Sequence, residues 1–189
     1  MTLTHLMPSL RRTLPDPLAR DRWPEFTVVS TTDVTIAGVS LLRLVDWCST
    51  PCVHTAAAVL PGTNGRPSET ELASVVVTRI TAVLPGSGGE QQVRIDAELD
   101  GCRPVLTECR LIGRASTAHT RPVALQSAST GSAHPVSLPA DLRVGDLVVV
   151  PCSGATSLHS VRSTSPGPRS IPQGLAEHGN NDARFGGLR

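Results

Sequence analysis

The residues best equipped for chemistry lie late in the chain, where Cys152, Ser153 and His159 follow one another closely. A thiol or hydroxyl becomes a nucleophile when a histidine takes its proton and a third group orients that histidine. On an extended segment Cys152 and Ser153 face opposite sides, so at most one of them can enter a pocket. Ser116 and His119 form a second polar pair. The candidates for catalysis are therefore Ser116, Cys152 and His159, although a buried thiol and surface polar groups are the simpler interpretation.

Cysteine and histidine also occur together earlier, at Cys48, Cys52 and His54. These three side chains could supply zinc ligands, with a fourth from Cys102, Cys109 or Cys152. Their spacing differs from the paired cysteines of strong zinc motifs, and buried cysteine commonly packs as a small apolar residue. We therefore predict no metal site. With five cysteines, an odd number, and no export signal, we expect reduced thiols and a cytoplasmic protein.

All 17 basic residues of the chain are arginine, so no side chain offers a primary amine. A lysine amine can form a Schiff base with a carbonyl compound such as pyridoxal phosphate (PLP), and arginine cannot replace it. The net charge of +1 and the four aromatic residues argue against nucleic-acid binding, which relies on basic patches and stacking platforms. No apolar run reaches the roughly 20 residues of a membrane helix. We predict no cofactor, no nucleic acid and no membrane partner.

The spacing of apolar residues predicts a mainly β fold, a single compact β-barrel-like domain with one short helix and disordered termini. We expect the helix at residues 41–47, capped by Ser40. Residues 1–25 are predicted to be a flexible N-terminal arm, residues 26–160 the β domain, and residues 161–189 a disordered tail. The expected strands are residues 26–30, 34–36, 52–60, 74–84, 92–99, 105–112 and 147–150.

Residues 92–99 alternate most regularly, with apolar side chains on one face and charged ones on the other. This pattern predicts that Asp96, Glu98 and Asp100 lie on a solvated face. Asp100-Gly101 then predicts a two-residue hairpin whose return strand is residues 105–112. Residues 135–143 are expected to form a loop.

Three blocks of the chain carry recognisable motifs. The first, residues 33–53, reads Asp-Val-Thr-Ile-Ala-Gly-Val-Ser-Leu-Leu-Arg-Leu-Val and ends with Ser-Thr-Pro-Cys-Val. The second, residues 65–106, contains Ala-Ser-Val-Val-Val-Thr-Arg-Ile-Thr-Ala-Val. The third, residues 145–155, reads Gly-Asp-Leu-Val-Val-Val-Pro-Cys-Ser-Gly-Ala. In this order they resemble the β domain of the fold-type III PLP-dependent decarboxylases, the diaminopimelate and ornithine decarboxylase family.

The resemblance also shows what the chain lacks. In that family a TIM-type barrel, a unit of about 250 residues, lies between the first two blocks and carries the PLP lysine. Here only residues 55–64 fill the interval. The family's Glu-Pro-Gly-Arg aligns with residues 63–66, so its Glu is lost, and Arg66 is either a residual anion contact or a solvated loop arginine. Its active-site Cys, Asp and Tyr align with Ser116, Thr120 and Thr156.

We therefore expect a degenerate, stand-alone β-barrel domain that has lost PLP binding and amino-acid decarboxylation. Such a pseudoenzyme would act as a binding or partner-association module, in a homodimer or with a full-length decarboxylase. The alternative is a PLP-independent small-molecule enzyme of a specialised biosynthetic pathway, because an emptied barrel can bind a small molecule at its mouth. A third possibility is a non-functional gene fragment.

Overall fold

The computed structural model describes residues 2–86 and 90–162, and it is mainly β with a few short helices, as predicted. Its strands are β1 (Val28–Val29), β2 (Val34–Ile36), β3 (Val39–Ser40), β4 (Cys52–Val59), β5 (Pro67–Pro85), β6 (Gln91–Ile95), β7 (Arg110–Ile112), β8 (Thr120–Gln126), β9 (Ala133–Pro139) and β10 (Leu147–Ser153). Its helical segments are α1 (Leu3–Leu6), η1 (Pro8–Arg12), η2 (Arg20–Arg22), α2 (Leu41–Cys48), η3 (Leu106–Glu108) and α3 (Leu158–Val161). Across these described residues, no helix has the length and apolar character needed to cross a bilayer.

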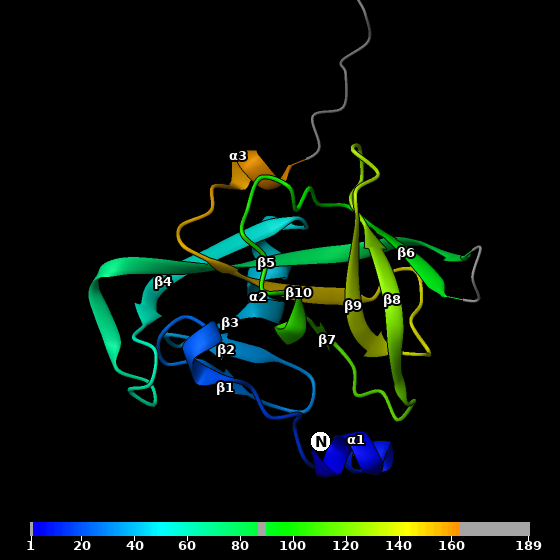
Figure 1. Cartoon of the computed structure of the whole chain (residues 1–189), viewed down its shortest axis with the longest axis horizontal. Helices are drawn as coiled ribbons and strands as arrows, with labels where there is room; N and C mark the ends of the chain where they lie inside the picture. Colours follow the sequence, from blue (N-terminus) through cyan, green and yellow to red (C-terminus); the bar gives the residue numbers. More distant parts are fainter. Residues whose placement is uncertain (1, 87–89, 163–189) are drawn as a thin grey trace, which may run out of the picture.

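Seven strands form the main sheet, in the order β7-β10-β5-β6-β8-β9, with β4 also paired to β5. The pairs are antiparallel except for β6 and β8, which run parallel. Strand β5 is 19 residues long and spans the molecule, pairing with β4 and β10 first and with β6 later. Strands β7 and β9, at the two ends of this order, contact each other, so the sheet is a nearly closed barrel (Figure 1).

Strands β5 and β10 separate two apolar clusters. Because successive side chains of a strand point to opposite faces, Val76 and Val148 enter the cluster inside the barrel, whereas Val77 and Val149 enter a second cluster. None of these four side chains is exposed to solvent. Burial on both faces explains why residues 147–150 form an uninterrupted apolar run.

The second cluster is covered by the small sheet β1-β2-β3 and by helix α2. Ser40 caps this helix as predicted, because its hydroxyl accepts a hydrogen bond from Arg43 N at 3.2 Å. Asp33 holds the cap in place by accepting from Ser40 Oγ at 2.6 Å and from Leu42 N at 3.2 Å. Leu41 and Val45 are the buried residues of α2, as expected for its apolar face.

The N-terminal segment, predicted as a flexible arm, lies against the domain in the structure. Trp23 is only 1% exposed and donates from Nε1 to Glu108 at 2.9 Å. Arg11 is 5% exposed and donates from Nη1 to the Ala118 carbonyl at 2.8 Å. These partners are 85 and 107 residues away, so local composition carried no sign of them. Of the predicted tail, residues 163–189 lie outside the described residues.

The predicted hairpin at Asp100-Gly101 is wrong. A turn does form there, with Cys102 N donating to the Leu99 carbonyl, but the flanking strands do not pair with each other. Strand β6 ends at Ile95 and pairs with β5 and β8, while β7 pairs with β10. A Cβ on Gly101 would lie 2.5 Å from the Ser160 carbonyl, so the glycine permits a close approach to α3.

The predicted loop at residues 135–143 is wrong over its first half, because β9 covers Ala133–Pro139. Pro135 and Pro139 suggested a loop, but β9 ends the strand order, and an edge strand tolerates the missing N–H of proline. Val136 and Leu138 alternate into the barrel core, as a strand requires.

The prediction of a solvated carboxylate face is wrong for Glu98, which is 8% exposed. Its carboxylate accepts hydrogen bonds from Ser129 N, from Ser129 Oγ at 2.6 Å and from Thr130 Oγ1 at 3.1 Å. Burial alone would raise the pKa of Glu98, but these hydrogen bonds lower it below its usual value. The segment between β8 and β9 thus lies over a residue that strand periodicity places outside.

Candidate functional site

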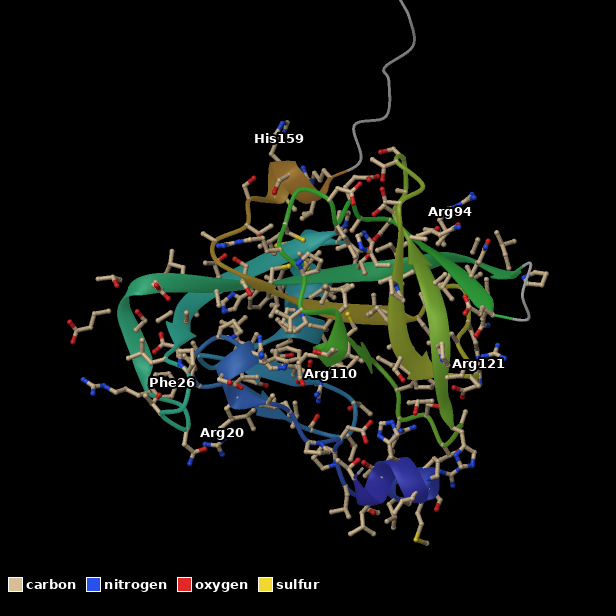
Figure 2. All side chains as sticks on the ribbon, viewed as in Figure 1. Arg20, Phe26, Arg94, Arg110, Arg121 and His159 are labelled. Atoms are coloured by element: carbon tan, nitrogen blue, oxygen red, sulfur yellow. The ribbon has the colours of Figure 1, made fainter. Side chains whose placement is uncertain are left out.

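A cavity lined by many polar side chains lies between the N-terminal segment, the β1–β2 connection and β7. Its volume is about 200 Å³. Figure 2 shows Arg110, the first residue of β7, near the middle of the molecule at this point. Six charged or polar residues that line the cavity are Arg11, Asp16, Asp33, Glu108, Arg110 and Ser116. Of the three predicted catalytic candidates Ser116, Cys152 and His159, only Ser116 lines this cavity.

Ser116 belongs to a hydrogen-bonded network that includes Arg114, another residue lining this cavity. Its hydroxyl donates to Asp141 Oδ1 at 2.5 Å and accepts from Ala118 N at 3.1 Å. Arg114 donates to the other oxygen of Asp141 at 3.0 Å and to both oxygens of Asp146, at 2.8 and 2.7 Å. Burial would raise the pKa of Asp141, but the hydrogen bonds from Ser116 and Arg114 lower it.

This arrangement does not make Ser116 a nucleophile. A general base must accept a proton near neutral pH, and a carboxylate with a lowered pKa has little affinity for one. Ser116 is only 3% exposed, and its hydroxyl is hydrogen-bonded to a carboxylate and to a backbone N–H. We interpret Ser116 as the residue that orients Asp141 toward Arg114.

The structure does not bring Cys152, Ser153 and His159 together. Cys152 is 1% exposed in the barrel core, and Ser153 is exposed on the opposite side of β10, as strand geometry predicts. His159 lies on α3 at the edge of the molecule, away from Arg110 (Figure 2). Hydrogen bonding with Cys102 and burial raise the pKa of the Cys152 thiol above its usual value, which disfavours the nucleophilic thiolate.

The cysteines near the start of the domain do not form a metal centre. Cys48 is exposed at the end of α2, whereas Cys52 is buried at the start of β4 and His54 is half-buried. Burial, with smaller contributions from nearby Cys48 and Asp96, raises the pKa of Cys52 to about 11. In residues 2–86 and 90–162, no three His, Cys, Asp or Glu side chains are placed to share a metal ion.

Of the family positions inferred from the resemblance, Ser116 and Thr120 line the same cavity, whereas Arg66 and Thr156 do not. Arg66 is exposed in the connection between β4 and β5, where its backbone N and O form hydrogen bonds within the turn. Thr120 exchanges a hydrogen bond with His5 at 2.9 Å, and Thr156 N donates to Ser74 Oγ. The residues present do not fit PLP, because no lysine exists to hold its aldehyde and Arg66 does not line the cavity with Ser116.

Sequence reasoning missed the two arginines that distinguish this cavity, Arg11 and Arg110. Arg11 lies in a segment predicted to be loose, and Arg110 in a strand predicted to return from a hairpin that does not exist. Arg11 and Arg110 are 99 positions apart in the sequence, and no sequence motif links them. The only available signal was their residue type, since a guanidinium inside an apolar stretch needs partners.

No family model matches the chain, and no curated protein matches it. Solved structures match parts of it. A diaminopimelate decarboxylase is 17% identical, with 46% of this chain and 26% of that chain covered and a TM-score of 0.34. The arginine decarboxylase of Paramecium bursaria Chlorella virus is 22% identical, with 43% and 25% covered and a TM-score of 0.34. The same enzyme bound to agmatine is 20% identical, with 43% and 25% covered and a TM-score of 0.31. This chain therefore spans about a quarter of the length of each decarboxylase.

Proposed function

We propose that this chain is a non-catalytic association domain with a decarboxylase-like β architecture, without PLP and without amino-acid decarboxylation. The observation that carries the proposal is the direct connection from β4 to β5. Residues 60–66 form a tight turn here, with Leu60 N donating to the Arg66 carbonyl at 2.9 Å and Thr63 N to the Leu60 carbonyl at 3.2 Å. The family that the sequence resembles has its catalytic barrel at this point.

Two further observations support the loss of chemistry. Without lysine the chain has no side chain that can form the Schiff base on which PLP catalysis depends. The candidate nucleophiles are also engaged elsewhere, since Ser116 donates to Asp141 and Cys152 is buried in the core.

An exposed apolar hollow supports association. Phe26 is 67% exposed and Val28 65% exposed, and both line a hollow of about 320 Å³ together with Leu18 and Val59. Phe26 has φ 50, in the left-handed region that a bulky side chain rarely adopts. A strained, exposed aromatic residue is a reason to look for a function at that position. In this proposal the hollow contacts a second copy of the chain.

An absorbance titration with PLP tests the first half of the proposal. We expect no internal aldimine band after gel filtration, because only the terminal amine could react. A band that survives gel filtration in a chain with an acetylated N-terminus would overturn this half.

Sedimentation equilibrium tests the second half. The wild-type chain should show a concentration-dependent dimer, and Phe26→Ser should weaken it about tenfold or more, since buried aromatic residues dominate interface energetics. Leu84→Ser is a matched control, because Leu84 is 39% exposed and lies outside the hollow. A wild-type chain that stays monomeric, or equal weakening by both variants, would contradict association through Phe26.

A further inference from the structure

The cavity beside β7 contains a buried guanidinium with an unused donor. Arg11 is 5% exposed, and its Nε donates to Asp16 at 3.2 Å while its Nη1 donates to the Ala118 carbonyl at 2.8 Å. Within the described part of the chain, Arg11 Nη2 is buried and has no hydrogen-bond partner. Buried polar groups are almost always paired, so an orphaned donor on a buried cation requires an explanation.

Arg110 also has an unused guanidinium donor, and it contacts the same N-terminal segment. Its Nη1 and Nη2 donate to the carbonyls of Asp16 and Pro17, each at 3.1 Å. Its guanidinium carbon lies over the Trp23 ring, 5.1 Å from the ring centre, within the range of a cation–π interaction. Arg110 Nε is buried and, among the described residues, without a partner. Arg11 and Arg110 therefore meet at Asp16, each with one donor unfilled.

The carboxylates of this cavity are already occupied by other donors. Asp33 accepts from Ser40 Oγ and from two backbone N–H groups, as part of the cap of α2. Glu108 accepts from Trp23 Nε1 and from a backbone N–H, and lies 3.8 Å from Arg110 Nη2. The Asp16 carboxylate accepts a hydrogen bond from Arg11 Nε and forms an ion pair with it. None of these contacts supplies an acceptor for Arg11 Nη2 or Arg110 Nε.

Both orphaned donors belong to guanidinium groups that line one cavity, and guanidinium donors are suited to oxyanions. Guanidinium groups bind carboxylate and phosphate oxygens with short, charge-assisted hydrogen bonds. The cavity of about 200 Å³ is below the range of roughly 300–1,000 Å³ typical of drug-sized ligands, which favours a small ligand. We propose that this cavity binds a small oxyanion, a phosphate or a carboxylate group, through Arg11 and Arg110.

Thermal unfolding at constant ionic strength tests this site with two probes, inorganic phosphate and malonate, each exchanged against chloride. A saturable rise in the Tm of the wild-type chain is expected with at least one probe, because a ligand that binds only the folded state stabilises it. A response to phosphate alone identifies a phosphate site, and a response to malonate alone identifies a carboxylate site. No saturable response to either probe would overturn the proposal.

Variants locate the response. Arg11→Lys keeps the charge but loses the planar donor set, and it should weaken probe binding by about tenfold or more. Arg121→Lys is the matched control, since Arg121 is exposed on β8 away from Arg110 (Figure 2), and it should bind as the wild type does. Equal affinity of the wild type and Arg11→Lys would overturn the assignment. Should Arg11→Lys not fold, the arginine Nε resonances of the wild type replace it. Arg110 Nε must then shift on addition of the probe, and an unchanged resonance would contradict the site.

Discussion

Arg114 and Arg11 line the same cavity, but their guanidinium groups are satisfied to different degrees. Every nitrogen of Arg114 donates to Asp141 or Asp146. These hydrogen bonds, of which the one to Asp146 has the larger effect, raise the pKa of Arg114 above its usual value. Arg11 is more deeply buried, with a side chain 6% exposed against 24% for Arg114, and it has one nitrogen without a partner. A complete set of partners makes an arginine part of the architecture, whereas an incomplete set leaves the capacity to bind a ligand.

The largest effect is expected for Arg114→Gln, which removes three charged contacts at once. We expect a loss of about 2–3 kcal/mol in the free energy of unfolding, because hydrogen bonds to charged groups contribute about 1.5–3 kcal/mol and these pairs are partly exposed. Chemical denaturation at pH 7 measures this loss. Arg94→Gln, at an exposed position of β6, should change stability by less than about 0.5 kcal/mol. Similar losses for both variants would show that the network contributes nothing specific.

Arg11→Gln is expected to have a smaller effect in chloride buffer, a loss of about 1–2 kcal/mol from the hydrogen bonds to Asp16 and Ala118. This loss should grow in the presence of the oxyanion probe, by about 1.4 kcal/mol for each tenfold excess over the dissociation constant, because only the wild type gains binding energy. The loss for Arg114→Gln should not change with the probe. Equal dependence on the probe for both variants would remove the distinction between the two arginines.

Ser116→Ala removes a single hydrogen bond to Asp141 and should cost about 1 kcal/mol at pH 7. Ser153→Ala, at an exposed position of β10, is the control and should have almost no effect. The comparison is made by urea denaturation. If Ser116 only orients Asp141, its removal should change the stability of the fold, whereas removal of a catalytic nucleophile would abolish an activity.

The smallest expected effect is the pH dependence of the Ser116→Ala loss. The folded-state pKa of Asp141 is lowered, so its contribution to stability is present above the unfolded-state pKa of about 3.9 and is lost as the pH falls through the folded-state value. The difference between wild type and Ser116→Ala should therefore be constant from pH 7 to about pH 5 and shrink below about pH 4. A difference that increases in acid would contradict the assignment of Asp141 as an ionised partner.

Much of the fold is predictable from local pattern. The helix at Leu41–Cys48 with its Ser40 cap, and the strands at Val34–Ile36, Cys52–Val59 and Leu147–Ser153, follow from apolar periodicity and capping chemistry. The candidate site is less predictable. Ser116 is a polar residue whose partner Asp141 is 25 residues away, and Arg11 donates to a carbonyl 107 residues away.

The wrong predictions of the hairpin and of the loop share one physical origin. The Asp100-Gly101 turn and the prolines of β9 are local signals, and neither specifies which strand lies beside its segment. Pairing of β6 with β8 and of β7 with β10 rules out the hairpin, and pairing of β9 with β8 makes the proline-containing segment a strand.

The sequence by itself determined the alternation that makes this chain a β protein, and it shows that no side chain here offers the primary amine on which an internal Schiff base with PLP depends. Only the tertiary structure decided which arginines are satisfied. Arg11 comes from the N-terminal segment and Arg110 from the start of β7, and they meet at Asp16 only when the chain has folded. Residue type is local information, whereas the partners of a buried charge depend on segments far apart in the chain.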